Sequence, residues 1–207
     1  MRTGHLLLSL LALGTPAAAQ LPPGWTARAD RGPASGIKLS PMGPGIHVSP
    51  GSSGIAYREQ DLQDRPFRAE ATFTQTRGST HPEGYGLFFA GKDLDGDGQA
   101  YTYFLIRSDG RFLVKQRKGA ETPTVVPWTA HEAVLPTDSE GKATNKLEID
   151  ATGPRVAFKV NGKTVHEAEI ADRTGVVGLR VNHDLDLHID GFQVQSGSRG
   201  AGRPGSR

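Results

Sequence analysis

The stretch that decides the fold runs from Gly84 to Lys118 and reads GYGLFFAGKDLDGDGQAYTYFLIRSDGRFLVKQRK. It contains three runs of strand-forming residues, separated by an Asp/Gly-rich loop and by a tight turn at Asp109-Gly110. Apolar runs bounded by such turn residues are typical of neighbouring antiparallel strands. The stretch therefore predicts the centre of an antiparallel sheet.

The turn at Asp109-Gly110 allows two registers. A two-residue loop would pair Arg107 with Phe112 and scatter apolar residues over both faces. A three-residue loop over 108–110, with Gly110 at positive φ, pairs Ile106 with Phe112. We expect the second register because burial of one apolar face fixes strand pairing. The core face then carries Phe104, Ile106, Phe112 and Val114, and the opposite face carries Tyr101, Tyr103, Leu105, Arg107, Arg111, Leu113, Lys115 and Arg117.

Short strand-like segments punctuated by turn residues fill most of the remaining chain. Asn161-Gly162, between two alternating runs, predicts a further hairpin. No window has a helical period, and residues 129–135 are expected to form at most a short turn. The pattern predicts an all-β fold, an antiparallel two-sheet sandwich. The expected strands are 37–40, 46–49, 54–59, 67–76, 84–90, 100–108, 111–118, 145–151, 155–161, 164–170, 176–182 and 187–195.

The two ends of the chain differ from the rest. Arg2 and His5 precede the short apolar run 6–13, and three alanines at 17–19 follow it. This order predicts a secretory signal peptide at 1–19 and export to the periplasm or beyond, whereas a buried N-terminal helix is the alternative. The run is too short to span a bilayer, which takes about 20 residues, and no transmembrane segment is expected. Residues 196–207 are expected to form a disordered Gly/Ser/Arg tail, which leaves 20–195 as a single β-sandwich domain.

Composition narrows the function classes. The chain has no cysteine, so disulfides, thiolate zinc sites and cysteine nucleophiles are excluded. The formal net charge is +2, and subtracting the four arginines outside 20–195 leaves the domain at −2. A nucleic-acid-binding domain would carry a clustered basic face, so no nucleic-acid partner is expected.

Five short motifs together resemble a known superfamily. They are GLFF at 86–89, YTYF at 101–104, DGRF at 109–112, VNG at 160–162 and GVVGLR at 175–180. They resemble the concanavalin A-like lectins and glucanases, and are most similar to bacterial laminin-G-like and 3-keto-disaccharide hydrolase-like domains. The resemblance covers about residues 67–194 and implies a jelly-roll sandwich, often with a concave sheet that contacts carbohydrate. Binding modules and glycosidases both occur on this fold, so the fold does not decide function.

Catalytic signatures are sparse. Glu148-Ile149-Asp150 is similar to the carboxylate motif of family 16 glycosidases on this fold, but the third carboxylate is absent. Since retaining hydrolysis needs two nearby carboxylates in different roles, no catalytic residue is assigned. His183 and His188 form a candidate zinc pair without a clear third ligand, and ordinary exposed histidines are the alternative.

The outward face of the central hairpin is the candidate ligand surface. Aromatic rings can stack on sugar rings, while long basic side chains reach hydroxyl groups. The alternative is a solvated face of ordinary cross-strand pairs. Trp128 is expected in the core rather than on this surface. The candidate ligand-binding residues are Tyr101, Tyr103, Arg107, Lys115 and Arg117.

The loop Asp93-Leu94-Asp95-Gly96-Asp97-Gly98 begins like a calcium-binding EF-hand loop. The match ends where the bidentate glutamate should stand, because that position is Phe104. Calcium bound by Asp93, Asp95 and Asp97 is one interpretation, and a plain Asp/Gly-rich strand connection is the other.

These observations converge on a secreted, lectin-like β-sandwich that binds glycans or has a structural role without catalysis. A glycoside-active hydrolase similar to the 3-keto-disaccharide hydrolases is one alternative, and a protein-interaction module is another. The oligomeric state stays open at this stage.

Overall fold

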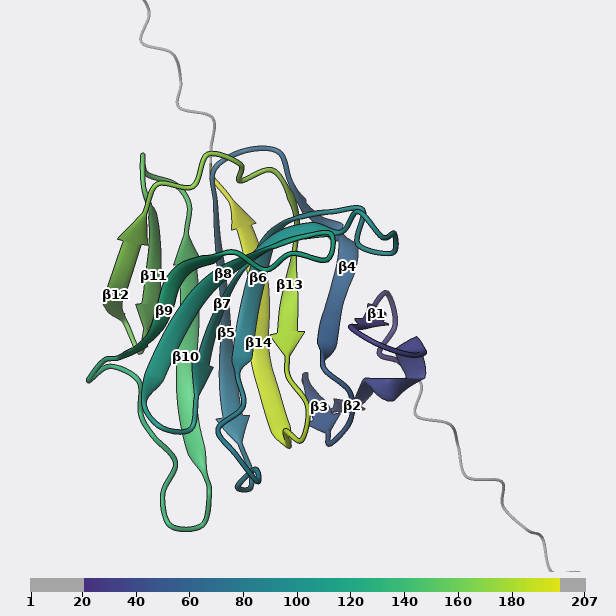
Figure 1. Cartoon of the computed structure of the whole chain (residues 1–207), viewed down its shortest axis with the longest axis vertical. Coiled ribbons are helices and arrows are strands. Elements are labelled where there is room, and N and C mark those ends of the chain that lie inside the picture. Colours follow the sequence, from purple (N-terminus) through teal and green to yellow (C-terminus); the bar gives the residue numbers. More distant parts are fainter. Residues whose placement is uncertain (1–20, 198–207) are drawn as a thin grey trace, which may run out of the picture.

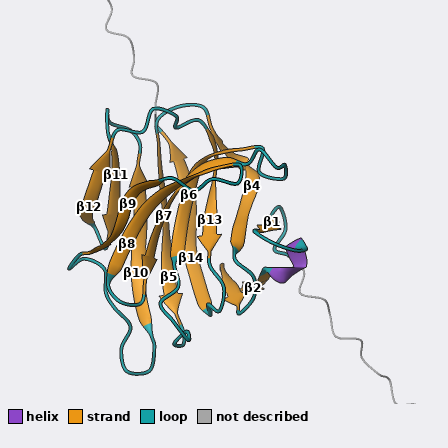
Figure 2. Cartoon of the chain, in the orientation of Figure 1, coloured by secondary structure: helices purple, strands orange, loops and turns teal. Residues whose placement is uncertain are grey.

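The computed structural model describes residues 21–197, and it shows two antiparallel β-sheets stacked on each other (Figures 1 and 2). The expected signal peptide (1–19) and residues 198–207 of the expected tail lie outside the described residues. Sheet 1 has seven strands in the order β1-β4-β13-β6-β7-β8-β9. Sheet 2 also has seven, in the order β12-β11-β10-β5-β14-β3-β2. The all-β sandwich predicted from the sequence is confirmed.

Several strands of sheet 2 alternate between buried and more exposed residues, whereas three central strands of sheet 1 are buried along nearly their whole length. Within residues 21–197 the one helical element is a three-residue 3-10 turn, η1 (Ala34–Gly36). No helix in this part of the chain is long and apolar enough to cross a membrane. The strands are β1 (Thr26–Ala29), β2 (Lys38–Met42), β3 (Gly45–Ser49), β4 (Gly54–Gln63), β5 (Phe67–Gln75), β6 (Tyr85–Lys92), β7 (Ala100–Arg107), β8 (Arg111–Lys118), β9 (Thr124–Ala130), β10 (Ala143–Asp150), β11 (Val156–Val160), β12 (Lys163–Ala168), β13 (Gly175–Val181) and β14 (Leu187–Ser196).

The register of the β7–β8 hairpin is the predicted one. Ile106 pairs with Phe112 and Phe104 with Val114, and Gly110 has a φ of +76°. All four paired side chains are at most 2% exposed and lie in the core between the sheets. The predicted hairpin between β11 and β12 is also present, with positive φ at both Asn161 and Gly162.

Two strands were not predicted, and both lie at the edges of sheet 1. β1 reads TARA, and its buried residues are only two alanines, which are depleted in strands. β9 contains Pro127, which lacks the N–H that a central strand would need. Edge strands pair on one side only, so their sequences are less constrained. The strand predicted at 187–195 continues for one more residue, to Ser196.

Sheet 1 also carries apolar residues on its outer face, the face turned away from sheet 2. This second cluster was not predicted, because the sequence pattern suggested a solvated face. Trp128 packs against it from β9, half-buried, instead of lying in the core as expected. The cluster consists of Ile55, Tyr57, Phe88, Leu94, Tyr101, Tyr103, Leu105, Leu113 and Val176.

Candidate functional site

The outer face of sheet 1 carries a row of aromatic rings that pack against one another. Phe88 on β6 packs over Gly178 on β13, where an added Cβ would lie 2.6 Å from the ring. The ring of Phe88 in turn lies 5.1 Å from that of Tyr101, which lies 5.7 Å from that of Tyr103. A glycine at 178 therefore leaves the space that the ring of Phe88 occupies.

A buried ion pair crosses this aromatic face. Arg180 on β13 is 7% exposed, and its two terminal nitrogens donate to the carboxylate oxygens of Asp30 at 2.6 and 2.5 Å. The same guanidinium lies 3.4 Å from the hydroxyl of Tyr101 and 5.7 Å from the ring centroid of Tyr103. Its Nε has no hydrogen-bond partner among the described residues. Bidentate pairing of this kind fixes both side chains in one geometry.

The electrostatics of the cluster keep the pair ionised. Burial would raise the pKa of Asp30, but hydrogen bonds from Arg180 and the positive charge around it outweigh burial and lower the pKa. Burial would likewise lower the pKa of Arg180, but Asp30 and the nearby phenols hold it above its usual value. Burial raises the pKa values of Tyr101 and Tyr103, so both tyrosines keep their hydroxyl protons at neutral pH. The cluster therefore offers neutral hydroxyl groups beside a permanent ion pair.

The structure places the predicted ligand residues on the predicted face but divides them between its two ends. Tyr101 and Tyr103 point outward as expected, yet they are only 4% and 8% exposed, so they are not open stacking platforms. Arg117 pairs across from Tyr101, and its Nε donates to the carbonyl of Gly119 at 2.5 Å. Lys115, across from Tyr103, is half-buried, and its Nζ lies 3.3 Å from the hydroxyl of Thr122.

Arg107 lies at the other end of β7, away from the ion pair. Its guanidinium stacks over the ring of Trp128 at 4.4 Å, and its Nε donates to Asp109 at 2.7 Å. This cation–π contact makes a small, separate aromatic surface next to the β7–β8 turn.

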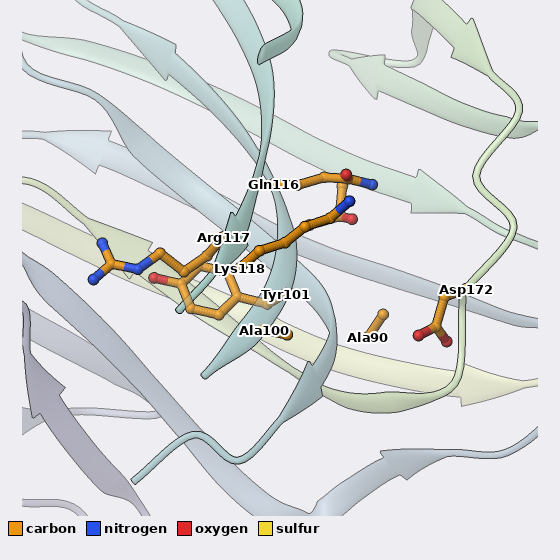
Figure 3. Close-up of a pocket in the computed structure, with 8 residues that line it drawn as sticks. Ala90, Ala100, Tyr101, Gln116, Arg117, Lys118 and Asp172 are labelled. Atoms are coloured by element: carbon orange, nitrogen blue, oxygen red, sulfur yellow. The ribbon is translucent and has the colours of Figure 1, made fainter. Parts of the chain in front are cut away.

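Cavities adjoin the ion-pair end of the face. A small one of about 80 Å³ opens where β7 and β8 meet the loop that carries Asp172 (Figure 3). In Figure 3 the side chains of Arg117 and Lys118 extend in opposite directions, and the hydroxyl of Tyr101 points the same way as Arg117. A cavity of this size has room for a few water molecules but not for a larger ligand.

Two larger cavities lie along β1. One of about 290 Å³ is lined by Arg28, Asp30, Arg31, Tyr57 and Asp95, among others. A second, of about 380 Å³, shares Asp30 and Arg31 and is also lined by Ser52, Ser53 and His183. Small-ligand pockets begin at about 300 Å³, so these volumes suit a small polar molecule. We call the two cavities together the β1 trough.

The Asp/Gly-rich loop closes over the same end of the sheet. Arg28 donates to the carbonyl of Leu94 at 2.9 Å and to that of Gly96, which fixes the loop against β1. Asp93, Asp95 and Asp97 are exposed, and their carboxylate oxygens do not all lie within 4.8 Å of one another. The three predicted calcium ligands are thus not gathered in this structure, and calcium binding stays a prediction.

The glycosidase-like string on β10 has a structural explanation. Leu147 and Ile149 are fully buried, while Glu148 and Asp150 lie on the outer face of sheet 2. Lys159 contacts both carboxylates, at 2.8 and 3.3 Å. Burial would raise the pKa of Asp150, but hydrogen bonds from neighbouring side chains, Thr152 first, hold it well below its usual range. Both carboxylates therefore act as partners in ion pairs.

Sequence reasoning missed the ion pair and the trough. Asp30 and Arg180 are separated by 150 residues and meet only in the fold. One local signal was available, since Arg180 is the single charged residue of the otherwise apolar strand β13. A charge that is buried in this way needs a partner or a function.

Comparisons with known proteins show the fold. No protein-family model matches the chain, and no curated protein matches it. Carbohydrate-binding module CBM66 from Bacillus subtilis is 15% identical, with a TM-score of 0.61 over 84% of this chain and 96% of that one. A Bacillus subtilis protein of unknown function with a galectin-like fold is 12% identical, with a TM-score of 0.56 over 83% and 89%. A putative glycosyl hydrolase from Parabacteroides distasonis is 15% identical, with a TM-score of 0.51 over 76% and 89%.

These similarities show a two-sheet β-sandwich, the architecture that the sequence pattern predicted. At identities this low they establish architecture, while function has to be argued from the site.

Proposed function

We propose that this chain is a non-catalytic carbohydrate-binding module whose ligand contacts the outer face of sheet 1 and the β1 trough. The observation that carries the proposal is the Asp30–Arg180 pair: Arg180 contacts the neutral side chains of Tyr101 and Tyr103, and Asp30 lines the trough. Buried donors without a partner, such as Arg180 Nε, are uncommon and call for an explanation. A buried water molecule beside this nitrogen would supply one, while Asp30, the partner of Arg180, is the member of the pair that a ligand in the trough can reach.

The chemistry of the trough fits a hydroxyl-rich, uncharged ligand. Two arginines and two aspartates line its smaller cavity, so their formal charges balance, and Tyr57 adds an aromatic side chain. Apolar walls with a few fixed polar groups are typical of small-ligand sites. The structural neighbours include a protein described as a carbohydrate-binding module, which supports this choice of ligand class.

Within this proposal, the predicted ligand residues have unequal roles. Arg117 and Lys115 border the ion-pair end and supply hydrogen-bond donors, whereas Tyr101 and Tyr103 form the floor beneath the ligand. Arg107 and Trp128 provide a second stacking surface for a longer chain of sugars.

A glycan array on the mature protein tests the proposal. We expect binding to at least one glycan class, and we expect Arg31→Ala and Arg117→Ala to weaken it at least tenfold. Arg31 is exposed, so its loss should leave the fold intact. Arg68→Ala is the matched control, because Arg68 is an exposed arginine on the outer face of sheet 2. The proposal fails if no glycan binds, or if Arg68→Ala weakens binding as much as the other two changes.

Glycosidase activity is the second candidate function, and one groove supports it. On the outer face of sheet 2, Glu70 and Glu148 line a cavity of about 380 Å³. Burial would raise the pKa of Glu70, but hydrogen bonds from Lys146 and Gln193 lower it. A glycosidase acid needs a raised pKa, so binding remains the better proposal. Release of reducing sugar from an array ligand would favour the glycosidase over the binding module.

The third candidate, a protein-interaction module, would present an exposed apolar patch. The large exposed apolar side chains of residues 21–197 are Met42, Leu62, Val125 and Leu135, and they lie on separate elements. This arrangement gives the interaction module no support.

Export of the protein belongs to the same proposal and rests on the sequence of residues 1–19. A periplasmic or extracellular module would meet glycans directly. After cell fractionation, the protein should be found in the periplasm or the medium with its N-terminus at Gln20. Protein that stays in the cytoplasm with an intact Met1 would contradict export.

A further inference from the structure

Two histidines and a glutamate from distant parts of the chain meet at one end of the sandwich. His81 and Glu83 lie in the connection between β5 and β6, and His183 lies in the connection between β13 and β14. His183 Nε2 is 3.2 Å from Glu83 Oε1, and His81 Nε2 is 3.7 Å from the same oxygen. One donor atom from each side chain lies within 4.8 Å of the other two.

These spacings resemble those around a bound ion. Zinc lies about 2.0–2.1 Å from its nitrogen and oxygen ligands, so neighbouring ligands of a tetrahedral site are about 3.3–3.4 Å apart. The two measured distances bracket that value. The imidazole centroids of His81 and His183 are 5.6 Å apart with an interplanar angle of 62°, so the rings do not stack on each other.

Hydrogen bonds orient Glu83 and join the two connections that carry the three side chains. Asn182 Nδ2 donates to Glu83 Oε2 at 3.1 Å, which leaves Oε1 facing the histidines. Asp184 accepts hydrogen bonds from the backbone and hydroxyl of Thr80, at 3.0 and 2.9 Å, and from Arg77 at 3.2 Å. The two connections are therefore fastened together without any ion. Such outer partners orient metal ligands in known sites.

Exposure differs among the three candidate ligands in a way that allows an ion to enter. The side chain of Glu83 is 11% exposed, whereas those of His81 and His183 are 61% and 53% exposed. His183 also lines the larger cavity of the β1 trough. The Glu83 carboxylate is thus mostly buried, whereas both imidazoles are accessible to solvent.

We propose that His81, Glu83 and His183 bind one divalent transition-metal ion of the zinc class per chain. Two nitrogen donors and one carboxylate favour zinc over calcium, which takes oxygen ligands. With three protein ligands, a fourth position is open to water or a ligand atom. The ion would join the β5–β6 connection to the β13–β14 connection. This site is separate from the Asp93–Asp97 loop, and it stands whether or not a glycan binds.

The sequence suggested a different partner for His183. His188 Nε2 instead lies 2.8 Å from Asp190 Oδ2, and this pair is not part of the cluster. His188 is therefore a matched control, because it is also a histidine beside a carboxylate.

The experiment is calorimetric titration of the chelator-treated, untagged mature protein with Zn²⁺, alongside melting curves with and without Zn²⁺. We expect one Zn²⁺ per chain and a rise in melting temperature, since an ion bound only by the folded state stabilises it. His81→Ala and His183→Ala should each weaken binding at least tenfold and remove the rise. Asn182→Ala should weaken binding about tenfold, the lower end for loss of an outer partner. His188→Ala should bind as the unaltered chain does.

Three results would overturn the proposal. The first is the absence of binding heat together with an unchanged melting temperature, which would leave an ordinary hydrogen-bonded cluster. The second is binding that survives in the His81→Ala/His183→Ala double variant. The third is loss of binding in His188→Ala. Circular dichroism of each variant separates loss of the site from loss of the fold.

Discussion

At the scale of single residues, Arg180 organises the outer face of sheet 1. Its neighbours in β13 are apolar, and its charge is held by one carboxylate that arrives from the loop after β1. An unpaired charge at this depth would be costly, so Asp30 is as necessary to the face as Arg180 is. This dependence can be measured.

Asp30→Asn should lower the free energy of unfolding by about 3 kcal/mol, the low end for a broken buried pair because Asp30 is 26% exposed. The loss comes from the guanidinium that remains buried without a counter-charge. Urea unfolding of Asp30→Asn, Arg180→Met and the double variant measures it. The double variant should lose less than the sum of the two single changes. Strict additivity would mean that the two side chains do not depend on each other.

Phe104 tests the assignment of the two faces of β7. It is fully buried and packs against Phe112 and Phe158 with ring centroids 6.3 and 5.2 Å away. Phe104→Ala should cost about 3–5 kcal/mol, as other buried phenylalanine truncations do. A urea midpoint equal to that of the unaltered protein would show that Phe104 faces the other way.

At the scale of elements, the β11–β12 hairpin allows the cost of a left-handed backbone conformation to be measured apart from side-chain contacts. Gly162 has a φ of +78°, and nothing lies within 4 Å of an added Cβ. Gly162→Ala should therefore cost about 1–2 kcal/mol from left-handed strain alone. Gly153→Ala is the control, because its φ is not in the left-handed region and its nearest contact is 3.6 Å away. Equal effects of the two changes on the melting temperature would contradict this explanation.

The strands show what sequence patterns can and cannot predict. β7 and β8 were predicted with the correct register because one residue of slip would have exposed Phe104 and Ile106. β1 was missed because it buries only two alanines, and β9 because an edge strand tolerates a proline such as Pro127. The second apolar cluster was missed because a tyrosine on a strand can face either water or other rings.

At the scale of the whole molecule, the site depends on contacts that no local pattern contains. Tyr101 and Tyr103 could be placed on one face from the sequence because both lie on one strand, and their role in binding stays a prediction. Asp30, Arg180 and the His81–His183 contact were not found, since each joins residues about 100 or more positions apart. Such pairs are produced by the order of strands in the sheet, which the sequence pattern left open.

The ion pairs make stability dependent on pH. The pKa values of Asp30 and Asp150 are lower in the folded chain than the usual value of about 3.9 in unfolded peptides. The stabilisation they provide is therefore complete above that value and is lost as the pH falls through the folded-state pKa values. Urea midpoints at constant ionic strength should fall steadily from pH 5 to pH 2, and less steeply for Asp150→Asn. A midpoint that rises on acidification would contradict this.

The central claim is that carbohydrate binds on the outer face of sheet 1, and nuclear magnetic resonance titration tests it most directly. With a glycan from the array, we predict shift changes at Tyr101, Tyr103 and Arg117 and along the β1 trough. Residues of the sheet 2 groove, such as Glu70 and Gln193, should stay unchanged. Changes confined to that groove would contradict the account.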